Sequence, residues 1–107
     1  MESEARLVMI DHEVPMPELQ YEITGRDGTT YRVDFAWPEE RVAGEYESVD
    51  WHAGRMEMLR DKKRFAGVQE VGWLVIPIVA GDVRERPARL AGRLNHHLAA
   101  ASRRKDA

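Results

Sequence analysis

Alternating apolar and polar residues predict a β-hairpin in the first half of the chain. Residues 19–24 and 29–37 both follow a two-residue period, and the loop between them contains two glycines. A strict alternation in the second strand would place Arg32 and Asp34 together on one face. The opposite face would then carry Tyr31, Val33, Phe35 and Trp37.

The remaining patterns predict two further strands and three helices. Residues 41–48 alternate, with Ala43 and Glu45 on one face. The continuous apolar run at residues 73–79 is typical of a strand buried on both faces, although Pro77 within it favours a bulge or a sheet edge. Three segments have the composition or spacing of helices: residues 2–12, 53–70 and 87–103.

The order of these segments predicts an αβββαβα arrangement, an α/β (α+β) fold with a mixed sheet flanked by helices. The chain has 107 residues, of which 43% are hydrophobic and 33% charged, so we expect one soluble domain over residues 1–107. Its longest apolar run is too short to span a bilayer, so no membrane partner is expected. Without a leader-like opening, a cytoplasmic location is expected. The lack of cysteine excludes a disulfide scaffold, a thiolate zinc site and a cysteine nucleophile.

Charge is unevenly distributed along the chain. Residues 1–50 contain 13 acidic and 4 basic residues, whereas residues 84–107 contain 2 acidic and 7 basic residues. Five more basic residues lie between Arg55 and Arg64. An acidic half beside two basic helices suits a cation site next to an anionic ligand such as nucleic acid. The alternative is that these charges simply solvate the surfaces of the helices.

Three carboxylates on the second and third predicted strands are candidate site residues. Glu45 and Glu47 are two residues apart on one strand and so point the same way, and Asp34 joins them on one concave patch if the strands form a meander. Clustered carboxylates repel each other, and a hard divalent cation such as Mg²⁺ is the usual compensation. The alternative is an exposed sheet face on which the acids pair with Arg32 and Arg41.

Several short motifs together resemble a known nuclease family. In their order and spacing they are similar to the PD-(D/E)XK superfamily, and more narrowly to the small domains related to very-short-patch-repair (Vsr) endonucleases. The resemblance covers the chain from Glu2 to about Leu98 and implies a restriction-endonuclease-like fold. The motifs are PMPELQ from Pro15, DFAWPEERVAGEYE from Asp34, the pair Trp51 and His52, DKKR from Asp61, and GWLVI from Gly72.

The resemblance implies Mg²⁺- or Mn²⁺-dependent hydrolysis of phosphodiester bonds, with DNA as the expected substrate. Asp34 and Glu45 take the positions of the metal ligands. Glu47 stands where the superfamily usually has lysine, and would act as a further ligand or orient the attacking water. His52 takes the position of a histidine that acts as an acid or base, or orients water.

Other positions are implied to support this site. Glu2 and Gln20 match residues that approach the metal as outer ligands, and Asp61 would orient His52 or pair with Arg64. The basic residues of the predicted helix at 53–70 are candidate phosphate contacts, because backbone contacts dominate nucleic-acid affinity. These residues are Arg55, Arg60, Lys62, Lys63 and Arg64.

A second function remains open from the sequence. The same fold could serve as a catalytically weak or inactive module that binds nucleic acid or protein. Glu47 in place of lysine favours this alternative, and so does Pro77, which stands where relatives often have a basic residue. The clustered acids favour the nuclease, because they would only repel phosphate in a binding module. A chain of this size has little surface for reading bases, so a protein partner could supply specificity.

Overall fold

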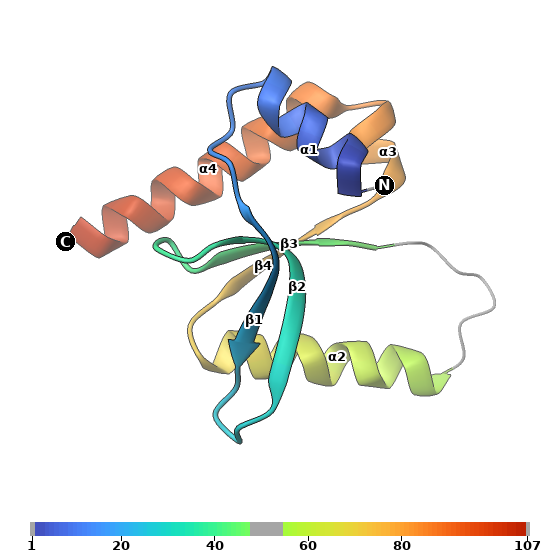
Figure 1. The fold of residues 1–107 in the computed structure, drawn as a ribbon, viewed down its shortest axis with the longest axis vertical. Helices are drawn as coiled ribbons and strands as arrows, with labels where there is room; N and C mark the ends of the chain where they lie inside the picture. Colours follow the sequence, from blue (N-terminus) through green and yellow to red (C-terminus); the bar gives the residue numbers. More distant parts are fainter. Residues whose placement is uncertain (1, 48–54, 107) are drawn as a thin grey trace.

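The described residues, 2–47 and 55–106 of this computed structural model, form a four-stranded mixed sheet with helices on both faces (Figure 1). The predicted α+β class and element order are therefore confirmed, with one short helix added before the last. The elements are α1 (Glu2–Asp11), β1 (Glu18–Thr24), β2 (Thr30–Trp37), β3 (Val42–Tyr46), α2 (Arg55–Glu70), β4 (Leu74–Ile78), α3 (Ala80–Arg84) and α4 (Pro87–Asp106).

The strands lie in the order β1-β2-β3-β4. β1, β2 and β3 form an antiparallel meander, as the sequence predicted, whereas β4 runs parallel to β3. β4 is therefore an edge strand, and Pro77 lies on it, exposed, at the register position of Glu45. An edge strand tolerates proline because the missing N–H removes no hydrogen bond inside the sheet. None of the described helices is long and apolar enough to cross a membrane.

The two faces of the sheet are covered differently. We call the side covered by α1, α3 and α4 the α4 face, and the side covered by α2 the α2 face (Figure 1). Leu90, Leu94 and Leu98 are spaced four residues apart on α4 and are buried on the α4 face. Val33 and Val68 are the largest fully buried side chains of the α2 face.

The predicted strict alternation in β2 is wrong, because the strand changes face at Asp34. Tyr31 and Val33 pack on the α2 face, whereas Phe35 and Trp37 pack on the α4 face. In the register of β1 with β2, the residues on either side of Asp34 have partners on β1. Asp34 itself is not paired with the residue opposite it, Gln20, whose φ is positive, at 50°. Few non-glycine residues adopt such a φ, and this local irregularity accounts for the change of face.

Candidate active site at the fork of β2 and β3

β2 and β3 separate beyond Phe35 and Gly44, which opens a fork between the two strands. Their ladder runs from the pair Trp37–Val42 to the pair Phe35–Gly44. Beyond it, the backbone N–H of Tyr46 donates a hydrogen bond to Asp34 Oδ2, with an N···O distance of 2.9 Å. A side-chain carboxylate thus satisfies a strand N–H that would otherwise lack an acceptor. Asp34 is therefore held at the mouth of the fork by the backbone of β3.

The side chain of Gln20 links Glu2 to the other oxygen of Asp34. The Gln20 amide Nε2 donates to Glu2 Oε1 at 2.6 Å and to Asp34 Oδ1 at 3.3 Å. The pKa of Glu2 is raised above its ordinary value of 4.5, mainly by a hydrogen bond that its carboxyl shares with Asp34, then by burial and by the negative charge of Asp34. The two acids are therefore close enough for Asp34 to disfavour the ionised form of Glu2.

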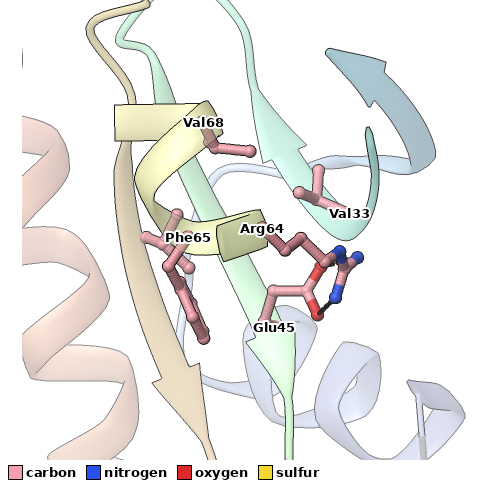
Figure 2. Close-up of a pocket in the computed structure, with 6 residues that line it drawn as sticks. Val33, Glu45, Arg64, Phe65 and Val68 are labelled. Carbon is pink, nitrogen blue, oxygen red and sulfur yellow. Dashed lines mark hydrogen bonds and ion pairs between the residues drawn. The ribbon is translucent and has the colours of Figure 1, made fainter. Parts of the chain in front are cut away.

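Glu45, on β3, is held by Arg64 from α2 (Figure 2). Arg64 Nη1 donates to Glu45 Oε2 at 3.0 Å and Nη2 donates to Oε1 at 2.7 Å, a bidentate pair. The same Nη2 also donates to the backbone carbonyl of Arg32 on β2. One guanidinium therefore joins the two strands of the fork.

The surroundings of Glu45 are apolar, and the residue is 7% exposed. Burial is the main cause that raises the pKa of Glu45 above 4.5; Arg64 lowers it and the charge of Asp34 raises it further. Because breaking a buried ion pair leaves an uncompensated charge, losing Arg64 would cost about 3–5 kcal/mol for a fully buried pair, and less here because Arg64 is partly exposed. The apolar lining consists of Val33, Phe65, Val68 and Val75.

Whether these side chains fit a metal ion depends on donor type and on arrangement. Across the described ranges, no three His, Cys, Asp or Glu side chains are arranged to hold a metal. Arg64 takes both oxygens of Glu45, and N–H donors take both oxygens of Asp34. The donor types do fit: the carboxylates of Glu2, Asp34 and Glu45 and the amide oxygen of Gln20 are ligands that Mg²⁺ prefers. A cation would also relieve the repulsion by Asp34, which adds to the shared hydrogen bond and burial in raising the pKa of Glu2 and to burial in raising the pKa of Glu45.

Other predicted site residues lie at or outside the limits of this arrangement. Glu47 is one residue beyond β3, half-buried, and its backbone N–H donates to the carbonyl of Ile78 at 2.8 Å. Its role beside Asp34 and Glu45 stays a prediction. His52 lies outside the described residues, as does its neighbour Trp51.

The basic residues of α2 divide into two groups. Arg60, Lys62 and Lys63 are exposed and, with Leu59 and Ala66, line a surface groove. Their predicted contact with phosphate stays a prediction. Arg64 instead faces the sheet, where Glu45 and the carbonyl of Arg32 take its guanidinium. For Arg55 and Asp61, which also belong to α2, the side chains are outside the described part of the structure.

The pairing of Arg64 with Glu45 is the feature that sequence reasoning missed. A signal for it existed: Arg64 lies four residues before the buried Val68 and so on the inward side of α2. The alternative pairing of the acids with Arg32 and Arg41 is not observed. Arg32 pairs with Glu22 at 3.3 Å, and Arg41 donates to the carbonyl of Val71 at 3.2 Å.

Comparisons with known proteins connect this chain to two mycobacterial relatives. It is 64% identical over 98 residues to the uncharacterized protein Rv2248 of Mycobacterium tuberculosis strain H37Rv. The uncharacterized protein MT2308 of strain CDC 1551 matches with the same identity and coverage. The match covers 92% of this chain and 36% of each relative, so the chain spans about a third of their length. No family model and no solved structure matches the chain.

Proposed function

We propose that this chain is a Vsr-like domain of the PD-(D/E)XK type that hydrolyses phosphodiester bonds in DNA, with Mg²⁺ or Mn²⁺ as cofactor. The observation that carries the proposal is the convergence of Glu2, Gln20, Asp34 and Glu45 at one fork of the sheet. The first and last of these four positions are 43 residues apart in the sequence. They are the positions to which the resemblance assigns the metal and its outer ligands. A purely structural sheet would gain nothing from acids that repel each other.

Each residue of the fork has a distinct part in this proposal. Asp34 and Glu45 would hold the cation, which when bound would polarise the scissile phosphate and lower the pKa of a water molecule. The Gln20 amide and the Tyr46 N–H orient the two oxygens of Asp34. Glu2 lies beside Asp34 as an outer acid. His52 and Glu47 keep their proposed roles in moving a proton or orienting water.

Contact with the nucleic-acid backbone is assigned to the outer surface of α2. Arg60, Lys62 and Lys63 are exposed there and can reach phosphates without disturbing the core. Such contacts position a substrate but do not read its sequence. We therefore propose that a protein partner supplies sequence or lesion specificity.

The test of the proposed hydrolysis is a cleavage assay with the purified chain. Plasmid, single-stranded and mismatched DNA are incubated with Mg²⁺ or Mn²⁺, with and without EDTA. We expect EDTA-sensitive nicking or cleavage, abolished in Asp34→Asn and reduced in Glu45→Gln by about 10²-fold or more, as for loss of a charge that stabilises a transition state. Glu22→Gln is the matched control, because Glu22 is an exposed acid that pairs with Arg32 outside the fork.

Circular dichroism would establish that each variant is folded before it is assayed. Folded wild-type protein that shows no EDTA-sensitive cleavage of any substrate would overturn the hydrolase. Cleavage that survives in Asp34→Asn would overturn the assignment of the site.

A binding module without catalysis is the second candidate, and the bidentate contact between Arg64 and Glu45 favours it. In that contact the guanidinium neutralises Glu45 and occupies both of its oxygens, so the charge of Glu45 needs no metal ion. A binder would retain DNA with EDTA present, and six phosphate contacts would give a log–log salt slope of about −5. Reversing Lys62 and Lys63 to Glu should then weaken binding to all sequences equally. Salt-insensitive retention would exclude backbone binding through α2.

A further inference from the structure

We propose that Arg64 is an internal counter-ion of the acid site, which holds Glu45 in the cation-free protein and releases it when a divalent cation binds. This inference rests on the proposed metal-dependent function and adds a regulatory residue to it. The sequence indicated that Arg64 contacts phosphate or pairs with Asp61. The inference gives Arg64 a different role, as the partner of Glu45.

The geometry makes the guanidinium and a cation compete for the same atoms. Both oxygens of Glu45 face Arg64, at 2.7 Å and 3.0 Å. Glu45 is buried on its other sides by Val33, Val68 and Val75. A divalent ion bound to these oxygens would lie within a few ångströms of the guanidinium, where two positive charges repel each other strongly in an apolar environment. Glu45 therefore has room for one cationic partner at a time.

Of the two partners, Arg64 is the one that can move. The Arg64 side chain is 36% exposed, whereas the Glu45 side chain is 9% exposed and lies on a central strand of the sheet. Arginine has a long side chain that can leave the fork by rotation alone, without a change in α2. The contact of Arg64 with the Arg32 carbonyl is made from the same guanidinium and would be lost in the same movement.

A counter-ion of this kind has a physical purpose in a metal-dependent site. Without a cation, the buried Glu45 would be a charge without a partner, which is costly in a folded protein. Arg64 removes that cost and bridges β2 and β3 where their ladder has ended. The same contact must weaken the binding of the metal, because the cation has to displace Arg64.

The test measures the affinity for Mn²⁺ by isothermal titration calorimetry in the full chain, without DNA. We expect Arg64→Gln to bind Mn²⁺ at least about 10-fold more tightly than the wild type. Changes of this size in metal affinity are typical when a residue that contacts a metal ligand is replaced. Arg89→Gln is the control: it removes the same charge from an exposed position on α4 and should leave the affinity close to that of the wild type.

Thermal unfolding with and without saturating Mn²⁺ provides a second readout. Arg64→Gln should unfold at a lower temperature than the wild type without metal, and Mn²⁺ should raise its Tm more than it raises that of the wild type. If Arg64→Gln does not fold without metal, Arg64→Lys is measured instead. Lysine keeps the charge but not the two-point contact, so its affinity should lie between the other two.

The outcomes separate this inference from the proposed function. The inference alone would be overturned if Mn²⁺ binding is lost in Asp34→Asn and Arg64→Gln binds Mn²⁺ no more tightly than the wild type does. In that case Arg64 would support the site rather than compete for it. If neither the wild type nor any Arg64 variant binds Mn²⁺ in a manner that depends on Asp34, the proposed metal-dependent function fails together with the inference.

Discussion

The α4 face and the α2 face of the sheet bury different kinds of side chain. On the α4 face, Phe35, Leu90 and Leu94 are buried in a continuous apolar cluster closed by three helices. On the α2 face, a single helix covers the sheet, and the apolar cluster stops where Glu45 and Arg64 begin. The difference predicts that the α4 face supplies most of the stability, while the α2 face accommodates the charged pair of the proposed nuclease site.

α4 and α2, the longest helices, differ in the same way as the two faces that they cover. α4 presents a seam of leucines spaced four residues apart. α2 has Arg64 on its inward side and a glycine, Gly67, against which the ring of Tyr31 packs. A Cβ at Gly67 would lie 2.5 Å from the Tyr31 hydroxyl oxygen, so any larger residue would force the Tyr31 ring to shift. α2 is therefore fitted to particular partners on the sheet.

The largest expected effect comes from removing a leucine of the α4 face. Leu94 is fully buried, so Leu94→Ala should lower the free energy of unfolding by about 2–5 kcal/mol through lost burial and a cavity. The measurement is urea unfolding followed by circular dichroism. Leu59→Ala on α2 is the control; Leu59 is 47% exposed, and its loss should change stability by at most about 0.5 kcal/mol. Similar losses in both variants would contradict the dependence of stability on the buried apolar cluster of the α4 face.

Glycine-to-alanine changes in the two helices should have opposite signs. Gly67→Ala on α2 should destabilise the protein by about 1–3 kcal/mol, because the new methyl group overlaps the Tyr31 ring. Gly92→Ala on α4 has no atom within 4 Å of the new Cβ and should stabilise the protein by about 0.4–1 kcal/mol. Both are measured by thermal unfolding.

A further variant isolates the cause. In a Tyr31→Ala background the overlap is absent, and Gly67→Ala should become neutral or stabilising, as expected from helix propensity alone. If Gly67→Ala stays as destabilising there as in the wild type, the packing of Tyr31 on α2 is not the reason for the glycine.

The smallest expected effect concerns the pH dependence at the fork. The folded pKa of Glu2 is raised above 4.5, mainly by the hydrogen bond that it shares with Asp34. The stability that protonation of Glu2 contributes is therefore fully present below 4.5 and is lost as the pH rises through the raised pKa. Glu2→Gln keeps the contact with Gln20 without the charge, so its stability relative to the wild type should rise with pH. The gain should stay below about 1 kcal/mol because Glu2 is only partly buried and solvent screens its charge.

Unfolding in urea at several pH values between about 4 and 8 covers this window. A difference between Glu2→Gln and the wild type that does not change with pH would contradict the shared hydrogen bond between Glu2 and Asp34.

Local patterns were sufficient to predict most elements of the fold. The two-residue period and the glycine-containing loop predicted the hairpin of β1 and β2, and the position of Pro77 in an apolar run favoured the sheet edge on which β4 lies. These features depend on residues close together in the chain, so the sequence alone shows them. α3 was missed because a helix of five residues is too short to show a period.

Motif order in the sequence singled out Glu2, Gln20, Asp34 and Glu45, and the structure places all four at one fork. What the sequence alone could not decide was how these residues are satisfied. The change of face at Asp34 depends on the backbone of Gln20 across the ladder, and the partner of Glu45 lies 19 residues away on a helix. Side chains so far apart in sequence meet only when strands and helix have packed, and the burial of Glu45 then makes a cationic partner necessary.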